Sequence, residues 1–566
     1  MRTVIRNGKI VNVLTREILP WSVVIEQGVI TCIGREVKKD SRTIEVDAKG
    51  QFLVPGLISA HDHYEMTLMS AVPFAEAVLP WGTTAAVFDP HDIVNVMGME
   101  GMRLLIEESR LTPLKAFFMV PPCVPSVPNL EKAGCEIRLE DIQRGLQMPN
   151  VLGVAEVMSF NRVLSSNDEE MQRILKWAGG NNLLIDGHCP EVRGEDLCRY
   201  IASGPIRTDH ESTSVEEQVE KLRKGMYVIL RRGSIKEPMS AGELVKKIGD
   251  TSNLLLAVDG CISPEDILEY GHMNWAVQQI ISEGVDPLVA IQMATINPAR
   301  CYRLDNRIGL IAPGRSADII FVGKLEEFNI TQVMVGGKII ENHPSFPRYP
   351  YPPCALKTLR LRSVSTHDLV IKAPISSGKV CVRIIEVSEG ELITKEIVEE
   401  ITISNGIAEV DPETDRLKVA VFERYGGGTH SLAFVRGFGL KKGALAGSIG
   451  QDSQNIVAVG VTDSDIAKAI NRILEIQGGI VVVEGGKIIG ELSLPIGGIM
   501  TNISPVELAE KRQEIKKALW MLGCKLKDPI FTLSLSITLV VIPSLKLSNN
   551  GLVDVKSGEL VNNFII

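Results

Sequence analysis

Six residues of metal-ligand type lie at the ends of five separate apolar runs of the chain: His61, His63, Glu156, His188, His210 and Asp259. His61 and His63 flank Asp62, so in a strand both imidazoles point to the same side and can reach one divalent ion. Four imidazoles and two carboxylates are more than one tetrahedral ion needs. We therefore expect two adjacent divalent ions, with Glu156 bridging them and a shared water acting as the nucleophile.

These side chains must be brought together by the apolar runs that precede them. Between about residues 55 and 304, runs of five to seven apolar residues alternate with helix-like stretches, as in repeated βα units. The runs are FLVPGLISAH, TTAAVFD, LKAFFMV, VLGVAEV, NNLLIDG, GPIRTDH, MYVILRR and LLLAVDG. Eight parallel strands predict an α/β fold, a (β/α)8 TIM-like barrel over 55–304, whose active site lies at the carboxyl ends of the strands.

The rest of the chain is expected to form two further domains. Residues 1–54 and 305–345 carry short β-type runs broken by Gly and Asn, which predicts a small composite β domain. After a Pro-rich linker, residues 355–566 read as an α+β domain with one helix over 463–477 and another opened by Ser504 and Pro505. Phe531 to Ile542 alternates apolar residues with Ser and Thr, which predicts a half-buried strand.

Composition narrows the function classes. The chain has 566 residues and a net charge of −9, with no Lys/Arg-rich run, so nucleic acid is not an expected partner. Ten scattered cysteines without a CxxC pair favour reduced thiols and a cytoplasmic location. The start of the chain lacks the apolar core of a signal peptide, and the most apolar late stretch is too short to span a bilayer, so no membrane partner is expected.

Each candidate ligand also has a structural interpretation. A single histidine is more often a hydrogen-bonded structural residue than a ligand, and a single acid is more often a solvated loop residue or a helix cap. It is the joint occurrence at strand ends that favours a metal site. His91 ends the second run, and from its position alone structural hydrogen bonding is the better interpretation. The remaining histidines follow no strand end and are not candidate ligands: His272, His343, His367 and His430.

The motifs of the chain resemble a known family. VPGLISAHDHYEM, NPAR at 297–300 and GLIAPGRSADIIFV at 309–322 are similar to the amidohydrolase superfamily. More narrowly, the chain resembles bacterial and archaeal adenine deaminases in FAEAVLPWGTTAAVFDPHDIVNVMG, GVAEVMSF, LLIDGHCP, TDHESTSVEEQVEKLRKGMYVILRRGS and VRGFGLKKGALAGSIGQDSQNIVAVG. The likeness covers nearly the whole chain, including a C-terminal domain of adenine deaminase type.

The resemblance implies an activity and a metal site. It places the family's metal ligands on the same six residues, with Mn²⁺ or Fe²⁺ as the ions and Zn²⁺ as an alternative. The implied reaction converts adenine to hypoxanthine and ammonia, so the partner is a small purine, and we expect a homo-oligomer, a dimer. Asp259 is the expected general base. Glu65 is the candidate acid if the first strand continues beyond His63, with Glu211 behind it, although either acid can instead orient a ligand histidine.

The chain departs from the family pattern at three places. Trp81 stands in Pro-Trp-Gly-Thr-Thr where the family reads Pro-His-Gly-Thr-Thr, and Gly260 follows Asp259 where the family has a second Asp. Gln451 and Gln454 replace two histidines, and Gln cannot carry the imidazole proton near pH 7.

These departures define the substrate-pocket candidates: Trp81, His91, Gln451 and Gln454. They also leave two alternatives to adenine deamination. The same metal site can act on another purine or a cyclic amidine or amide, or the chain can be a catalytically silent binding protein.

Overall fold

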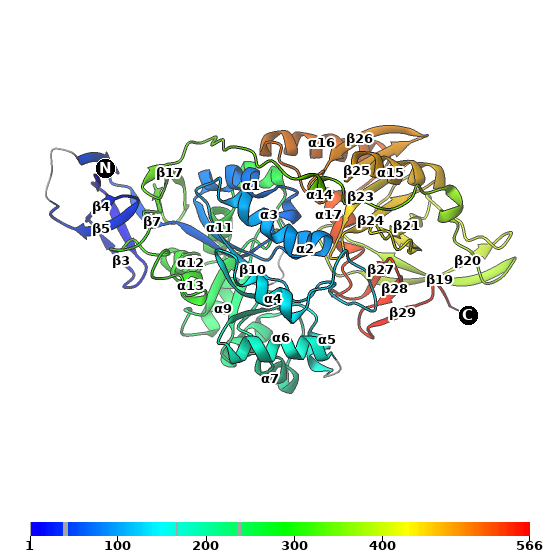
Figure 1. The fold of residues 1–566 in the computed structure, drawn as a ribbon, viewed down its shortest axis with the longest axis horizontal. Coiled ribbons are helices and arrows are strands. Elements are labelled where there is room, and N and C mark those ends of the chain that lie inside the picture. Colours follow the sequence, from blue (N-terminus) through cyan, green and yellow to red (C-terminus); the bar gives the residue numbers. More distant parts are fainter. Residues whose placement is uncertain (1, 38–42, 166–167, 235–238, 566) are drawn as a thin grey trace. The chain divides into compact units, whose positions relative to one another are not determined.

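The computed structural model describes residues 2–37, 43–165, 168–234 and 239–565. The chain folds into two compact units, which are described separately (Figure 1). The barrel unit comprises Met1–Pro90, Leu105–Pro122 and Arg138–Tyr349. The second unit comprises His91–Leu104, Cys123–Ile137 and Pro350–Ile566. Residues 91–104 and 123–137 lie within the range predicted for the barrel, whereas the structure groups them with the C-terminal residues.

The barrel unit is built on parallel strands that match the apolar runs of the sequence. They are β8 (Leu57–Asp62), β9 (Thr83–Phe88), β10 (Lys115–Val120), β11 (Val151–Val157), β12 (Leu184–Gly187), β13 (Thr208–Asp209), β14 (Tyr227–Arg231) and β15 (Leu254–Ala257). Strands β8 to β12 form one sheet and β13 to β15 another. The amide of Arg207 donates to Ile185 O at 2.8 Å, and the amide of Asp259 donates to His61 O at 3.2 Å. Backbone hydrogen bonds therefore join each edge of one sheet to the facing edge of the other. The predicted (β/α)8 architecture is confirmed.

The barrel interior is filled by side chains that alternate along these strands. Ile58, Val87, Phe117, Met119 and Leu255 are buried in one cluster, as expected for a packed barrel core. The helices of this unit are α1 (Ala71–Val78), α4 (Leu139–Gly145), α5 (Phe160–Leu164), α6 (Glu169–Gly180), α7 (Gly194–Ala202), α8 (Val215–Arg223), α9 (Ala241–Lys247), α10 (Pro264–Tyr270), α11 (Met273–Ser282), α12 (Pro287–Met293) and α13 (Ile296–Cys301). Helix α3 (Met99–Ser109) begins in the second unit and ends in this one.

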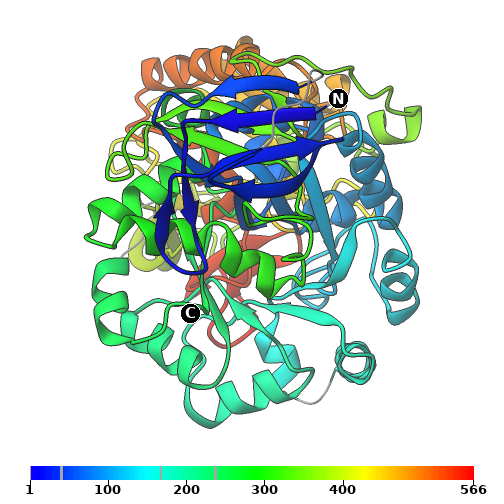
Figure 2. The ribbon, with the colours of Figure 1, turned by 90° about the vertical axis from the view of Figure 1, so that its left-hand side faces the viewer.

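Two small sheets complete the barrel unit, one made of N-terminal strands alone and the other of strands from both ends of the unit. One has the order β5 (Val29–Gly34), β4 (Ser22–Glu26), β1 (Arg2–Arg6), β6 (Thr43–Asp47). The other has the order β18 (Lys338–Ile339), β17 (Ile330–Val335), β16 (Ile319–Val322), β7 (Phe52–Pro55), β2 (Lys9–Asn12), β3 (Glu17–Leu19). Strand β7 pairs with the antiparallel β16, with Leu53 opposite Phe321, so the N-terminal strands lie beside strands some 270 residues later (Figure 2).

The second unit is a mixed sheet covered by helices. Its strand order is β20 (Lys395–Ile403), β19 (Gly378–Glu386), β22 (His430–Arg436), β21 (Leu417–Phe422), β24 (Asn455–Gly460), β23 (Ala444–Gly450), β25 (Gly479–Glu484), β26 (Lys487–Ser493), and β30 (Phe564–Ile565) pairs with β19. A smaller sheet holds β27 (Leu545–Ser548), β28 (Gly551–Asp554) and β29 (Glu559–Val561). The helices are α2 (His91–Met97), α14 (Pro353–Leu356), α15 (Asp463–Ile476), α16 (Pro505–Met521) and α17 (Pro529–Phe531).

Local sequence signals explain the two long helices of this unit. The side chain of Ser504 accepts a hydrogen bond from the Glu507 amide with Pro505 at the first helical position, which confirms the predicted start of α16. Helix α15 ends at the left-handed Gln477, one residue before Gly478. Ile466, Ile470 and Ile473 of α15 are buried with Val481 of the sheet, which anchors the helix to it.

The insertion 123–137 packs into the second unit through polar contacts. Asn455 donates to Lys132 O at 3.0 Å, and the Lys132 amide donates to Asn549 Oδ1 at 3.0 Å. The hydroxyl of Ser548 donates to Leu130 O at 2.5 Å. These bonds link residues more than 300 positions apart, so local sequence patterns do not reveal them.

The strand predicted from Phe531 to Ile542 is wrong. The segment follows α17 and continues as a π-helical turn over Thr532–Ser536. Both its apolar and its hydroxyl side chains are buried. Ser534 and Thr538 donate to carbonyls three or four residues earlier, at 3.1 Å each, and Ser536 donates to Glu391 O at 2.8 Å, so these hydroxyls are satisfied inside the protein and do not mark a solvent face.

No helix among the described residues is long and apolar enough to cross a membrane.

Candidate metal centre

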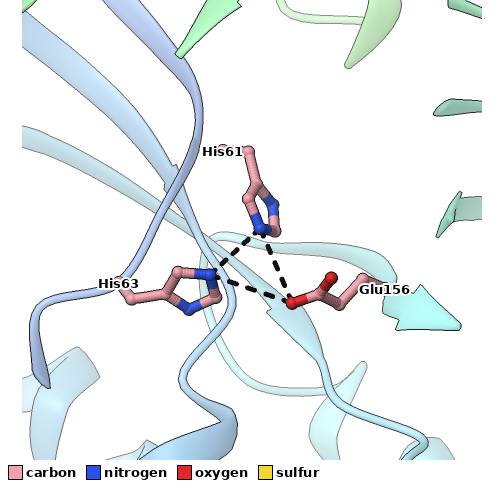
Figure 3. Close-up of side chains that lie close together, drawn as sticks. All are labelled: His61, His63 and Glu156. Atoms are coloured by element: carbon pink, nitrogen blue, oxygen red, sulfur yellow. Dashed lines mark hydrogen bonds and ion pairs between the residues drawn. The ribbon is translucent and has the colours of Figure 1, made fainter. Parts of the chain in front are cut away.

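The imidazoles of His61 and His63 meet at the carboxyl end of β8. Their Nε2 atoms lie 3.0 Å apart (Figure 3). Oδ1 of Asp259, from the loop after β15, lies 3.3 Å from Nε2 of His61 and 3.1 Å from Nε2 of His63. All three side chains are buried. Three donor atoms, from the ends of β8 and β15, therefore lie close enough together to share one ion.

Glu156 at the end of β11 stands between two pairs of histidines. Its Oε1 lies 3.7 Å from Nε2 of His61 and 3.8 Å from Nε2 of His63, on the side shown in Figure 3. Its Oε2 lies 2.8 Å from Nδ1 of His188 and 3.2 Å from Nε2 of His210. One carboxylate thus faces a histidine pair with each oxygen, which is the arrangement expected of a residue that bridges two ions.

The donor set fits divalent metal ions. Nδ1 of His63 lies 2.7 Å from the carbonyl oxygen of Asp89, which can only accept, so Nδ1 carries the proton and Nε2 offers a lone pair toward the cluster. Nε2 of His188 is buried and has no hydrogen-bond partner among the described residues. Imidazole nitrogens and carboxylate oxygens together suit manganese, iron or zinc.

Electrostatics keeps both carboxylates of the cluster ionised. Burial raises the pKa of Glu156, but His210 and hydrogen bonds from the surrounding histidines hold that pKa well below its usual range. The pKa of Asp259 is held well below its usual range in the same way, by His210, His61 and His63 against the effect of burial. Burial lowers the pKa of His61, but Asp259 and Glu156 outweigh it and raise that pKa well above its usual value. The two carboxylates therefore carry buried negative charge that a cation can balance.

Two protein-family models match this chain. The amidohydrolase family model matches residues 52–340, and the model of the adenine deaminase C-terminal domain matches residues 391–559. A protein of Archaeoglobus fulgidus named adenine deaminase is 42% identical over 562 residues, which cover 99% of this chain and 95% of the relative. The chain belongs to the adenine deaminase family.

The chain is also similar to a second curated relative and to a solved structure. An adenine deaminase of Moorella thermoacetica is 37% identical over 571 residues, covering 99% of this chain and 95% of the relative. The solved structure of an enamidase, a member of the amidohydrolase superfamily, is 18% identical with a TM-score of 0.46 and covers 60% of this chain and 95% of its own.

Within this adenine deaminase family member, Arg231 is a site residue that the sequence reasoning missed. It ends β14 and is buried. Its Nη1 donates to Asp259 Oδ2 at 2.9 Å and also forms an ion pair with Glu211. The available signal was an arginine at the end of an apolar run, in the position where the other strands carry their ligands.

The two candidate acids differ in their surroundings. Strand β8 ends at Asp62, and Glu65 begins a short 3₁₀ turn over Glu65–Thr67, so the expectation that Glu65 shares a strand side with His63 is wrong. Glu65 is nevertheless buried. Glu211 pairs with Arg231, and its Oε1 lies 3.9 Å from Nε2 of His210.

A second buried network supports the strand that carries the two neighbouring histidines. Oδ1 of Asp62 accepts hydrogen bonds from the amides of His63, at 3.1 Å, and Gly260, at 3.0 Å. His272 lies with its Nε2 3.2 Å from Oδ2 of Asp62 and its Nδ1 3.1 Å from Oγ1 of Thr83. His272 directly precedes α11 and follows no strand end, so the sequence carried no signal for its role.

The substrate-pocket candidates are not all brought together. Trp81 lies just before the amino end of β9, whereas the candidate metal ligands lie at carboxyl ends, so the structure does not support Trp81 as a pocket residue. In the second unit, Gln451 and Gln454 donate to the two oxygens of Asp92 at 2.8 and 2.6 Å. Nε2 of His91 lies 3.4 Å from oxygens of both Asp92 and Asp452.

Proposed function

We propose that this chain hydrolyses adenine to hypoxanthine and ammonia with two divalent ions. The observation that carries the proposal is the position of Glu156, which presents one oxygen to His61 and His63 and the other to His188 and His210. Relatives named adenine deaminase that match 99% of the chain support adenine as the substrate.

The residues that would hold the ions are those of the cluster. His61, His63 and Asp259 would hold one ion, His188 and His210 the other, and Glu156 both. When bound, divalent ions of this kind supply a water whose pKa is lowered enough to act as a nucleophile near neutral pH. Mn²⁺ or Fe²⁺ are the proposed ions, with Zn²⁺ as the alternative.

Asp259 is the proposed general base. The reaction forms a bond from a water oxygen to C6 of adenine and breaks the bond from C6 to the exocyclic amine. Asp259 accepts the proton of the attacking water and passes it to the departing amine, which leaves as ammonia. The ion pair with Arg231 keeps the Asp259 carboxylate in one orientation while it does so.

The remaining candidates have narrower proposed roles. Glu65 is the proposed donor of a proton to the ring nitrogen, because it is buried and follows His63 by two residues, and it takes back the remaining hydroxyl proton as the C6 carbonyl forms. Glu211 acts through Arg231. His91, Gln451 and Gln454 are proposed to contribute to substrate recognition.

The cellular setting is also a proposal. No disulfide joins any of the ten cysteines, all of which lie in the described residues, and five of them are buried, as in a reducing compartment. We propose a cytoplasmic enzyme of adenine catabolism that works as a dimer.

The test is direct. Purified protein loaded with Mn²⁺ is incubated with adenine, and hypoxanthine and ammonia are measured together. Equimolar release of the two products supports the proposal. Metal uptake without turnover of adenine overturns it, and a panel of other purines and cyclic amides then distinguishes a different substrate from a silent binding protein.

A further inference from the structure

Lys221 is a lysine with no exposed surface inside the barrel unit. It lies in the last turn of α8, and its side chain is 0% exposed. Its ammonium donates to the carbonyl oxygen of Cys189 at 2.9 Å and to Oδ2 of Asp209 at 2.8 Å. It also donates to Ser212 Oγ at 3.2 Å and to Glu217 Oε1 at 2.6 Å.

Two of these partners are chain neighbours of proposed metal ligands. Cys189 directly follows His188, and Asp209 directly precedes His210. Oδ1 of Asp209 accepts a hydrogen bond from the amide of Cys189 at 3.0 Å, so the two strand ends are linked to each other as well as to Lys221. Because the backbone is held beside His188 and His210, the Cα positions of both histidines are held as well.

Lys221 places one positive charge between two buried carboxyl groups. Asp209 and Glu217 are both 0% exposed, and both contact Lys221. Burial lowers the pKa of Lys221, but Asp209, Cys189 and Glu217 outweigh it, so the pKa is raised and the side chain stays charged. A buried ion pair of this kind contributes little net stability compared with a well-packed apolar replacement. Its presence beside two ligand positions therefore suggests a role other than stability.

From these contacts we infer that Lys221 is a positioning residue for the metal centre. It holds the backbones beside His188 and His210 so that both imidazoles face the same oxygen of Glu156. The inference rests on the proposed two-ion function. Removing Lys221 therefore selectively weakens the ion held by His188 and His210, while the ion held by His61 and His63 is retained.

The test compares Lys221→Met with Lys224→Met in the full chain. Lys224 follows the same helix and pairs with Glu220 at 2.8 Å, but its partners lie away from the ligand positions, so it is a matched control. Mn²⁺ binding is measured by equilibrium dialysis with elemental analysis, which resolves the stronger and weaker ions. We expect Lys221→Met to bind the second ion about 10- to 100-fold more weakly and the first ion normally. Lys224→Met should bind both as the native protein does.

Two further variants keep the test decisive if Lys221→Met does not fold. The double variant Asp209→Asn with Lys221→Met removes both charges of the Lys221–Asp209 ion pair, so neither is left buried alone. It should show the same selective loss of the second ion. Ser212→Ala removes one acceptor and keeps every charge, so a smaller loss in the same direction is expected. Mn²⁺ affinities within twofold of native in these variants overturn the inference, whatever the thermal midpoint does. Failure of the native protein to bind a second ion would instead count against the proposed function.

Discussion

Arg231 and Asp259 form a buried ion pair at the rim of the barrel, with Nη1 of the arginine 2.9 Å from Oδ2 of the aspartate. The other oxygen of Asp259 faces Nε2 of His61 and His63. Each oxygen of the proposed base therefore has its own set of partners. The carboxylate is held in a single orientation before any substrate arrives.

Removal of the proposed base should stop chemistry without unfolding the protein. Asp259→Asn keeps the size of the side chain but cannot accept the proton. We expect kcat to fall by about 10²- to 10⁴-fold, measured by hypoxanthine release, with an unchanged circular dichroism spectrum. Metal content is measured in parallel, and equal activity would exclude Asp259 from the mechanism.

Loss of the arginine should act through Asp259. Arg231→Met leaves Asp259 and Glu211 without their shared cation, and we expect kcat to fall about 10- to 100-fold. Arg232→Met is the matched control, because Arg232 is also buried but pairs with Glu283 at 2.7 Å. That control should lose stability, seen in its thermal midpoint, and keep its kcat per folded molecule. Equal kcat values in the two variants would remove Arg231 from the site.

Glu156 should be needed for both ions. Glu156→Gln is nearly isosteric but removes the negative charge that both histidine pairs face, so we expect bound Mn²⁺ after gel filtration to fall from about two ions per chain to less than one. Glu169→Gln, at an exposed position of α6, should retain the native content. Retention of one tightly bound ion in Glu156→Gln would show that Glu156 does not bridge.

The two glutamines at the family's histidine positions can be tested together. Gln451 and Gln454 both donate to Asp92, and neither can carry an imidazole proton near pH 7. We expect Gln451→His with Gln454→His to raise kcat/KM for adenine. An unchanged kcat/KM would show that these positions do not limit turnover.

Lys546 should make the stability of the second unit depend on pH. It is buried and donates to the carbonyls of Leu392, at 2.6 Å, and Ser536, at 2.7 Å. Burial lowers the pKa of Lys546 to about 7. Between pH 7 and the higher pKa of an unfolded lysine, the unfolded chain binds more protons, so stability rises with pH by at most about 1.4 kcal/mol per pH unit. Below pH 7 the cost of burying the charge is fully present.

The measurement compares thermal midpoints from pH 7 to pH 9. Lys546→Met should lack this rise relative to the native protein, whereas Lys487→Met, at an exposed position of β26, should keep it. Parallel curves for the native protein and Lys546→Met would contradict the assignment.

The strands and the ligand cluster could be predicted because their signals are local. Each barrel strand is a run of apolar residues, and parallel strands in a barrel bring their carboxyl ends to one rim. Residues such as His188 and Glu156, far apart in the chain, could therefore be placed together from their positions at strand ends. The caps of α16 were equally local, since Ser504 bonds to an amide three residues later.

Other features depend on contacts that no local pattern contains. The alternation from Phe531 to Ile542 indicated a strand, but both its apolar and its hydroxyl side chains are buried. Thr538 donates to a carbonyl one helical turn earlier, and Ser536 donates to Glu391 O, 145 residues away. Glu65 was a candidate on the condition that the first strand continues beyond His63, and nothing in the sequence marks the end of β8 at Asp62.

The sequence by itself determined the barrel and the set of residues that can bind metal, because strand periodicity and strand-end position are properties of short segments. Only the tertiary structure decided how those residues are held: Arg231 against Asp259, His272 against Asp62, and Lys221 between the two strand ends. Buried polar side chains must find partners wherever the fold places them, and in these three cases the partners lie up to 210 residues away in the chain.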